Sequence, residues 1–505
     1  MSAVTPSCVR PTPEQVVPLF RTLFSRPLLK QWLREAADAQ PHPVPRLYWR
    51  LFTPLIVLWG LIVQRLQADQ TDDAVVAHLH TGAADALDPH DPHSQPLSQR
   101  LRSESTAAYV QARARLPLAL LHRAMAHVVE QVQGWLAATS TPATWHGHPV
   151  RLLDGTTWRL APTPALVAAY GQASNQHGDG YWVVVRSVAT FCLHTQLCTA
   201  VTEAAPTTSE SALVRAVVEQ AAPGTIHVGD INFGVYRVAQ VAIALGQQVV
   251  LRLRPDRAEA LLRANGQRGP RPSGQAWAVE WARKAGTQYE TTLAAGPLGG
   301  RVLYVRLQQA GFRPIDLYLF TTLLDPLAYP VAEVVALYGL RWQVELDYRH
   351  IKSTLEMEEF RAQSPAVFRL ELAAGLLTYN LVRAVMVQAA QRAGLAVTRL
   401  SFVRCWRRVR TALVEGVPAW VAHGGQIAEW LVTRLAKCRL PHQPHKVAHE
   451  PRKVRRRPQV FPALKGDRAR ARQEALVQLG YVGEDAGSTS GAERAAQPAA
   501  VRQAA

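Results

Sequence analysis

Residues 338–352 read YGLRWQVELDYRHIK and carry four polar side chains at the spacing Y-x2-R-x3-E-x6-K: Tyr338, Arg341, Glu345 and Lys352. At about 100° per residue, these side chains fall within an arc of about 60° on one helix. Asp347 points about 180° away from Tyr338, so Glu345 is the acid on this face. A carboxylate flanked by two cations and a phenol suits a metal-binding acid that meets a phosphodiester. The alternative is a solvated helix face with Arg341 and Glu345 as an ordinary i,i+4 pair.

The chain before this helix changes from a helical to an extended pattern at Val150. Strands are expected from residue 151, over 181–193 and over 197–203. A helix (208–221), a strand (225–229), a helix (234–245) and a strand (248–253) follow. Three strands followed by alternating helices and strands predict an α/β fold, with a mixed sheet and helices on its faces.

Two aspartates lie on these expected strands, Asp154 on the first and Asp230 at the end of the fourth. If the two strands are neighbours, both acids meet at one edge of the sheet, and Glu345 reaches them from its helix. Three converging carboxylates need a cation, and oxygen ligands favour Mg²⁺ or Mn²⁺. Two such ions would act on the attacking and leaving oxygens of a phosphodiester. Read singly, Asp154 is also a turn residue and Asp230 a helix N-cap.

Changes of pattern along the chain predict five regions. They are a helical N-terminal domain (1–145), the first part of the catalytic core (146–255), a β-rich insertion (256–330), the remainder of the core with C-terminal helices (331–440), and a basic, largely disordered tail (441–505). In the N-terminal region we expect helices over 27–38, 47–66, 72–80 and 105–137. In the insertion we expect a hairpin of strands 287–293 and 301–307, and a further strand over 316–322. The tail carries arginines at 451–458 and at 468, 470 and 472, and is either a phosphate-binding arm or a solubilising segment.

The composition points to a polyanionic partner. The 505 residues include 56 Lys and Arg against 38 Asp and Glu, which gives a net charge of +18 and a pI near 10.1. Nucleic acid is the first expectation and an anionic membrane the second. Five scattered cysteines without a CxxC pair argue against a disulfide framework or a zinc finger and fit a reducing cytosol. We expect no signal peptide and no membrane span, because the apolar run 51–63 is too short and predicts a buried helix.

With these motifs the chain resembles the DDE transposases of bacterial insertion sequences, specifically the insertion-sequence-four family. The Y-R-E-K helix matches the family signature in full, Leu153-Asp154-Gly155-Thr156 matches its first acidic motif, and Asp230 with Phe233 matches its second. The resemblance covers roughly residues 45 to 390. It implies a ribonuclease-H-like mixed sheet with flanking helices, interrupted by a β-rich insertion before the glutamate and preceded by a helical N-terminal domain that recognises terminal inverted repeats.

The resemblance also implies the activity. Asp154, Asp230 and Glu345 would be the catalytic, metal-binding acids, with two Mg²⁺ or Mn²⁺ ions, and Tyr338, Arg341 and Lys352 would contact DNA phosphates. The reaction would be hydrolysis at transposon ends, followed by attack of the freed 3′-hydroxyl on target DNA. The implied partner is double-stranded DNA, with at least a dimer in the synaptic complex, in the cytoplasm of a bacterium at its nucleoid.

The sequence departs from the family at a few positions. Ile231 follows the second aspartate, where Arg or a small residue is common in the family. A Trp that stacks on a flipped base in relatives with hairpin chemistry is replaced by Leu317, next to Tyr318, with Trp277 and Trp281 as other aromatic candidates. Two other functions stay open: a DNA-binding protein that has lost transposition, and a structure-selective nuclease.

Overall fold

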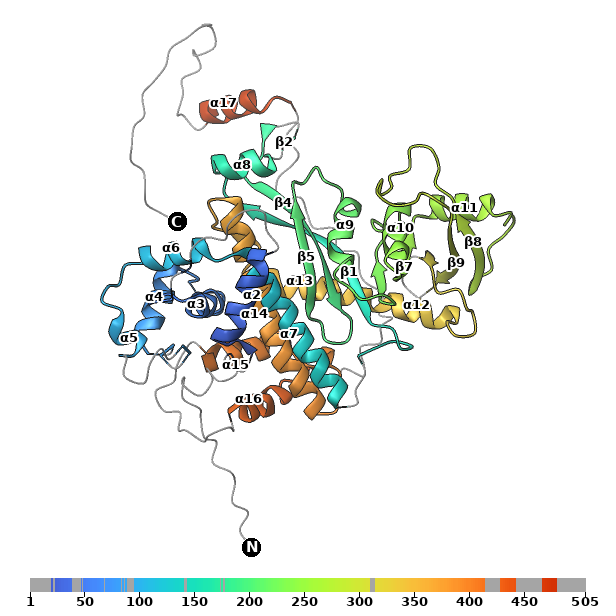
Figure 1. Cartoon of the computed structure of the whole chain (residues 1–505). Coiled ribbons are helices and arrows are strands. Elements are labelled where there is room, and N and C mark those ends of the chain that lie inside the picture. The colour runs from blue at the N-terminus through green and yellow to red at the C-terminus, as the bar shows by residue number, and fades with distance from the viewer. Residues whose placement is uncertain are drawn as a thin grey trace. The chain divides into compact units, whose positions relative to one another are not determined.

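The computed structural model describes residues 20, 23–38, 47, 49–67, 69–82, 84–85, 87–88, 95–139, 143–172, 174–175, 178–308, 314–413, 427–441 and 466–478. The chain divides into two compact units, residues 1–309 with 313–447 and residues 310–312 with 448–505 (Figure 1). The described part of the second unit consists mainly of helix α17 (Arg468–Gln478), which buries no side chain. It holds three arginines of the predicted tail, whereas the tract 451–458 lies outside the described residues.

The N-terminal part of the first unit is helical. Its helices are α2 (Arg26–Asp38), α3 (Pro54–Leu66), α4 (Asp72–His80), α5 (Leu97–Arg100), α6 (Ala107–Arg115) and α7 (Leu118–Ala138). Thr53 caps α3 and Thr71 caps α4, since each side chain accepts a hydrogen bond from a backbone N–H of the first turn. Every residue of α3 is buried, which confirms the buried helix predicted from the apolar run. The helix predicted over 105–137 is instead α6 and α7, because Pro117 between them has no N–H to continue the first helix.

A mixed sheet follows. Its strands are β1 (Val150–Leu160), β4 (Val183–Cys192), β5 (Cys198–Ala204), β6 (Ile226–Gly229), β7 (Gln248–Leu253), β8 (Gln275–Trp281), β9 (Leu298–Leu307), β10 (Ile315–Thr321) and β11 (Glu359–Phe360). The strand order is β5-β4-β1-β6-β7-β10-β9-β8, and β11 pairs with the far end of β1. β1, β6 and β7 run parallel, whereas β4 is antiparallel to both β1 and β5. The predicted mixed α/β fold is therefore confirmed. Strands β2 (Ser174–Asn175) and β3 (Gly178–Asp179) form a separate small hairpin.

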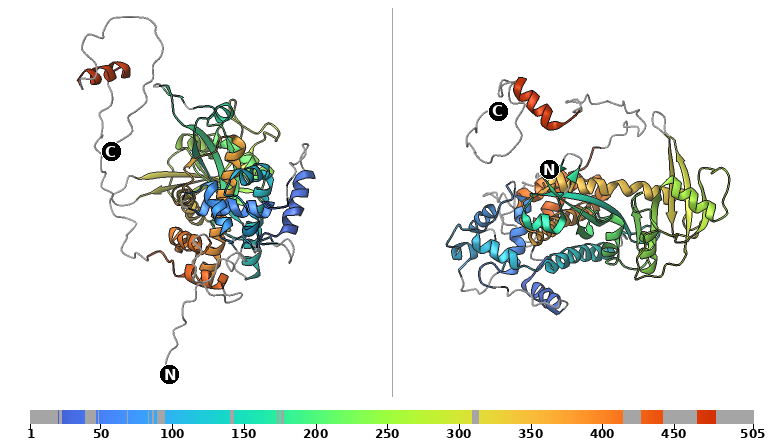
Figure 2. Two further views of the ribbon diagram at one scale, coloured as in Figure 1. Left: turned by 90° about the vertical axis from the view of Figure 1, so that its left-hand side faces the viewer. Right: turned by 90° about the horizontal axis from the view of Figure 1, so that it is seen from above.

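Helices cover both faces of this sheet (Figures 1 and 2). Leu152 of β1 packs in one core with α7 and α14 (Pro365–Arg392), whereas Leu153 packs in a second core with α9 (Glu210–Val218) and α10 (Tyr236–Ala244). Successive side chains of a strand point to opposite faces, and both faces here are apolar. Helix α14 is long and apolar enough to cross a membrane, but 89% of its most apolar window is buried inside the protein, as in a core helix. Helix α8 (Pro164–Tyr170) packs beside β4.

The predicted insertion extends the same sheet, because β10 pairs antiparallel with β7 and β9 with β10. The strand predicted over 316–322 is confirmed as β10, but the strand predicted over 287–293 is wrong. The hairpin partner of β9 is β8, and helix α11 (Pro255–Ala264) precedes it. Glu290 explains the error: its N–H bonds to Gln240 and its carboxylate pairs with Arg237 at 2.7 Å, which ties this segment to α10 as a loop.

The signature residues lie on one helical stretch with changing geometry. It consists of α12 (Val331–Gly339), a 3₁₀ turn η1 (Leu340–Trp342), α13 (Gln343–Arg349) and a π turn η2 (His350–Thr354). After α14, the short 3₁₀ turn η3 (Val397–Arg399) leads into α15 (Phe402–Leu413), and α16 (Ile427–Ala436) follows. The spacing predicted a uniform α-helix over 338–352. Because the stretch contains a 3₁₀ turn and a π turn, the side-chain directions of an ideal helix apply only where side-chain contacts agree with them.

Candidate active site

Asp154 and Asp230 lie at the same level on two neighbouring parallel strands. The register pairs Leu153 of β1 with Gly229 of β6, and each aspartate is the next residue along the chain. The two strands are therefore neighbours, which is the condition under which the sequence brings both acids to one edge of the sheet. Side chains two residues apart on a strand point to the same face of the sheet. Asp154 follows Leu152 at this spacing, and Asp230 follows Val228, so both carboxylates belong to the face covered by α13 and α14.

The environment of Asp154 disfavours its charged form. Burial raises the pKa of Asp154 to about 7, and the negative charges of Asp230 and Glu210 add to this shift. The Gly155 N–H, which donates to Asp154 Oδ1 at 2.9 Å, and the charge of Arg341 act in the opposite direction. A half-buried carboxylate beside a second carboxylate is the environment in which a bound cation is stabilising.

Three of the four signature side chains are next to one another. Arg341 donates to Glu345 Oε1 at 2.6 Å, and the Glu345 side chain is 56% exposed. Burial raises the pKa of Tyr338, while the adjacent cations Arg341 and Arg252 lower it and the charge of Asp230 raises it. The contacts therefore place Tyr338, Arg341 and Glu345 together, and Arg341 is also close enough to Asp154 to interact with its charge.

Lys352 lies farther along β1. Its ammonium group donates to the Thr157 carbonyl at 2.8 Å and sits 5.2 Å from the centre of the Trp158 ring. Burial lowers the pKa of Lys352. The Tyr348 hydroxyl donates to the Asp154 carbonyl at 3.1 Å, so α13 and η2 together hold the edge of β1 between its pairings with β6 and β11.

Asp347 points away from this group, as its helical offset predicts. It is fully buried and accepts hydrogen bonds from Arg383 at 2.7 Å and from Tyr379 at 2.9 Å. Burial raises the pKa of Asp347 to about 6, against the lowering effect of Arg383. Asp347 therefore anchors the signature helix to α14, and Glu345 is the acid on the open side.

Glu210, the first residue of α9, is an acid that the sequence reasoning missed. A Cβ atom on Gly155 would lie 2.4 Å from Glu210 Oε1, so the glycine of the L-D-G-T motif makes room for this carboxylate. Glu210 Oε2 also accepts from the Asn232 side chain at 3.4 Å, and the Asn232 N–H donates to Asp230 at 2.9 Å. A glycine directly after the first aspartate was the available signal for a group packed beneath β1.

The donor set fits a hard divalent cation in part. Asp154 and Asp230 offer adjacent carboxylate oxygens, the ligands that Mg²⁺ and Mn²⁺ prefer. Over the ranges that the structure describes, no group of three or more His, Cys, Asp or Glu side chains is arranged to hold a metal ion. Among the described residues, Glu345 is engaged through Oε1 by Arg341, and its side chain is 56% exposed.

The aromatic candidates for base stacking are built into the fold. Leu317 and Tyr318 are buried in β10, and the Tyr318 hydroxyl donates to Glu259 at 2.9 Å. Trp281 is also buried, and Trp277 is half-buried below the guanidinium of Arg271. The structure brings none of these four side chains into contact with the aspartates.

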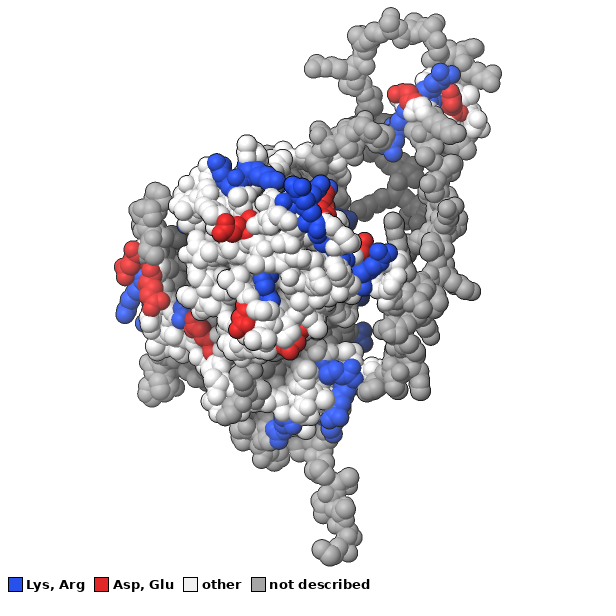
Figure 3. Space-filling view, turned by 90° about the vertical axis from the view of Figure 1, so that its right-hand side faces the viewer, with Lys and Arg blue, Asp and Glu red and all other residues white. Residues whose placement is uncertain are grey.

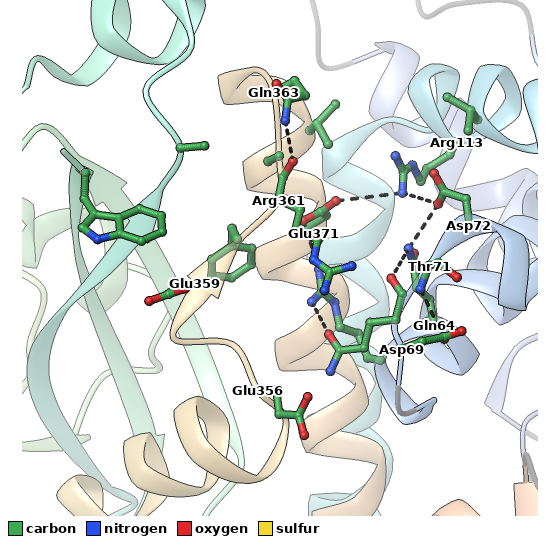
Figure 4. Close-up of a pocket in the computed structure, with 18 of the residues that line it drawn as sticks. Gln64, Asp69, Thr71, Asp72, Arg113, Glu356, Glu359, Arg361, Gln363 and Glu371 are labelled. Carbon is green, nitrogen blue, oxygen red and sulfur yellow. Dashed lines mark hydrogen bonds and ion pairs between the residues drawn. The ribbon is translucent and has the colours of Figure 1, made fainter. Parts of the chain in front are cut away.

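A separate cavity of about 980 Å³ lies between the N-terminal helices and the segment after η2 (Figure 4). Its wall includes a buried ion pair, Arg65 of α3 with Glu371 of α14 at 3.1 Å, and a second pair, Arg113 with Asp72 at 2.7 Å. None of the described residues that line it belongs to the predicted site. The first pair joins the N-terminal helices to the core, whereas the second links α6 to α4.

Comparison with known proteins assigns the region that contains this site. Residues 145–381 match the transposase DDE domain. The chain is 26% identical over 295 residues to the transposase InsG for insertion sequence element IS4 of Escherichia coli, which covers 56% of this chain and 62% of InsG. It is 30% identical over 94 residues to the putative transposase y4zB of Sinorhizobium fredii, which covers 19% of this chain and 26% of y4zB. The chain thus spans less than two thirds of these curated relatives.

Among solved structures, a piggyBac transposase synaptic complex with hairpin DNA aligns with 85% of this chain and 86% of its own, at a TM-score of 0.39 and 9% identity. The matched domain, residues 145–381, contains Asp154, Asp230 and the signature helix. Residues 145–381 therefore form a region similar to the transposase DDE domain, and the chain is similar to the transposase of IS4.

Proposed function

We propose that this protein is a transposase that binds the terminal inverted repeats of an insertion sequence and catalyses Mg²⁺-dependent DNA strand cleavage and strand transfer. The observation that carries the proposal is the juxtaposition of Asp154 and Asp230 on adjacent parallel strands, with Tyr338 and Arg341 within electrostatic reach. The transposase DDE domain over 145–381 supports it.

The core is of the ribonuclease-H-like type in this proposal. The order β5-β4-β1-β6-β7, with β4 antiparallel between β5 and β1 and with β1, β6 and β7 parallel, supports that assignment. Residues 1–145 would bind the DNA ends, 146–255 and 331–440 would form the core with its C-terminal helices, 256–330 would be the insertion, and 441–505 a basic tail.

The chemistry would be shared between acids and cations of the site. Asp154, Asp230 and Glu345 would hold two Mg²⁺ or Mn²⁺ ions, which when bound supply Lewis acidity to the phosphodiester oxygens. Tyr338, Arg341 and Lys352 would contact phosphates near the cleaved end. Because Arg341 is paired with Glu345, a DNA phosphate that takes over the guanidinium would release Glu345 toward the two aspartates.

The partner is double-stranded DNA, both as transposon end and as target. The net charge of +18 supports a polyanionic partner. Synapsis of two ends implies at least a dimer in the complex, and the place of action would be the nucleoid in a bacterial cytoplasm.

Cleavage of a labelled duplex that carries the inverted repeats flanking this gene tests the proposal. With Mg²⁺, the wild type should nick at the repeat end and then join the freed end to a target, whereas Glu345→Ala should bind the repeat and do neither. Glu219→Ala removes the same charge at the exposed end of α9 and should keep the activity. Repeat binding without cleavage by any of the proteins would favour a DNA-binding protein that has lost transposition. Cutting of branched DNA without joining would favour a structure-selective nuclease.

A further inference from the structure

Helix α15 and its neighbours form a cationic surface outside the candidate active site. Between Glu371 and Glu415 the chain contains seven arginines and no acidic residue. Six exposed cations of this region form what we call the α15 surface: Arg399, Arg404, Arg407, Arg408, Lys437 and Arg439.

The two sides of α15 have opposite character. Phe402, Cys405, Trp406 and Val409 are buried, at the i, i+3, i+4, i+7 spacing of an inward face. The ring of Phe402 stacks on that of His350 with centroids 4.5 Å apart, which packs α15 against η2. The arginines occupy the outward face.

Backbone contacts bring the cations of three segments together. Arg404 donates to the Arg439 carbonyl at 3.3 Å, and the Leu440 N–H donates to the Arg399 carbonyl at 2.8 Å. Arg408 donates to the Cys438 sulfur at 3.0 Å. The segment after α16 therefore lies directly against η3 and α15.

Among the residues that the structure describes, no carboxylate is paired with these cations. Within the described ranges, none of the six forms an ion pair with a carboxylate, whereas Arg123, Arg215 and Arg369 elsewhere on the surface each pair with a glutamate. Figure 3 shows Lys and Arg without Asp or Glu in the lower part of the molecule, at the height of α16 in Figure 1. Clustering like charges without partners is destabilising unless a polyanion occupies the surface.

We propose that the α15 surface binds the phosphate backbone of duplex DNA. Five of its six cations are arginines, whose forked donors match phosphate oxygens. An anionic membrane fits less well, because membrane-surface helices insert an apolar face and the apolar face of α15 is already packed in the core. The inference rests on the proposed function for its choice of polyanion, and it adds a contact region outside the Y-R-E-K helix.

The test is the salt dependence of DNA binding by the full chain. Each phosphate contact contributes about 0.9 to the slope of log affinity against log salt concentration. With a duplex of unrelated sequence between 50 and 200 mM NaCl, the triple variant Arg404→Gln, Arg407→Gln, Arg408→Gln should lower that slope by about 2–3. The control Arg215→Gln, Arg237→Gln, Arg369→Gln removes the same charge from arginines that pair with glutamates outside the proposed DNA-binding N-terminal domain, and it should keep the wild-type slope.

Further variants and a vesicle-binding measurement distinguish DNA binding by the α15 surface from loss of folding and from membrane binding. Lysine in place of the same three arginines should keep most of the slope, and unfolding curves establish that the glutamine variant is folded. Equal slopes for the glutamine triple variant and the control would overturn the inference. Tighter binding to anionic phosphatidylserine vesicles than to DNA, lost in the triple variant, would also overturn it. Glu345→Ala should keep the slope while losing cleavage, so failure of the catalytic proposal is a distinct result.

Discussion

At the scale of single residues, a side chain from another part of the chain explains why position 155 is a glycine. Its φ lies outside the left-handed region, so alanine is allowed there by the backbone, and the three atoms nearest to a Cβ atom all belong to the Glu210 side chain. Gly155→Ala should therefore lower the free energy of unfolding by about 1–3 kcal/mol, as overpacking does. In a Glu210→Ala background the same change should cost much less. Urea unfolding of the four proteins measures this coupling, and equal costs in both backgrounds would contradict the contact.

His227 predicts a pH dependence of stability. It is buried in β6, where Nε2 lies 3.0 Å from Gln247 Oε1, and burial followed by the charge of Arg151 lowers its pKa to about 3. Below about pH 6.5 the unfolded chain takes up a proton that the folded protein refuses. Stability is therefore complete above pH 6.5 and is lost as the pH falls toward 3.

The change His227→Gln should remove this contribution. Between pH 7.5 and 5.5 the wild type should lose about 1 kcal/mol more unfolding free energy than the variant, because one group with these two pKa values binds about one extra proton when unfolded at pH 5.5. Urea titrations at the two pH values measure the difference. The same loss in both proteins would assign the effect to other groups.

At the scale of elements, periodicity predicted what depends on local pattern. The strands predicted over 225–229, 248–253 and 316–322 located β6, β7 and β10, and helical offsets separated Glu345 from the buried Asp347. Contacts between segments that are distant in the sequence could not be predicted from local patterns. The loop at Glu290 has strand composition but is held by α10, and Glu210 reaches the site only because α9 begins beneath Gly155. The 3₁₀ and π turns around α13 likewise follow from packing rather than from residue spacing.

The buried pair between α3 and α14 gives a prediction about element docking. Arg65 and Glu371 are both buried at 3.1 Å, and Arg113 adds a second cation 3.9 Å from Glu371. Glu371→Ala leaves the Arg65 guanidinium buried without its carboxylate and should cost about 3–5 kcal/mol of unfolding free energy. Arg65→Met with Glu371→Leu should recover much of this loss, since it buries no charge. Thermal unfolding compares the variants, and a cost below about 1 kcal/mol for Glu371→Ala would show that the cavity wall relaxes without penalty.

At the scale of the whole molecule, a cation at the candidate site should couple to global stability. A ligand that binds only the folded protein stabilises it by about 1.4 kcal/mol at a concentration ten times its dissociation constant. Mg²⁺ should therefore raise the unfolding midpoint of the wild type. Asp230→Asn should have two opposite effects: it should raise the midpoint without metal, because it removes a charge that disfavours ionised Asp154, and it should abolish the rise with Mg²⁺. The measurement needs no DNA and no turnover, so it reports on the acids alone. An equal shift of the midpoint by Mg²⁺ in wild type and variant would show that Mg²⁺ binds elsewhere. A lower midpoint of Asp230→Asn without metal would show that Asp230 stabilises β1 and β6, and that its repulsion of Asp154 is the smaller effect.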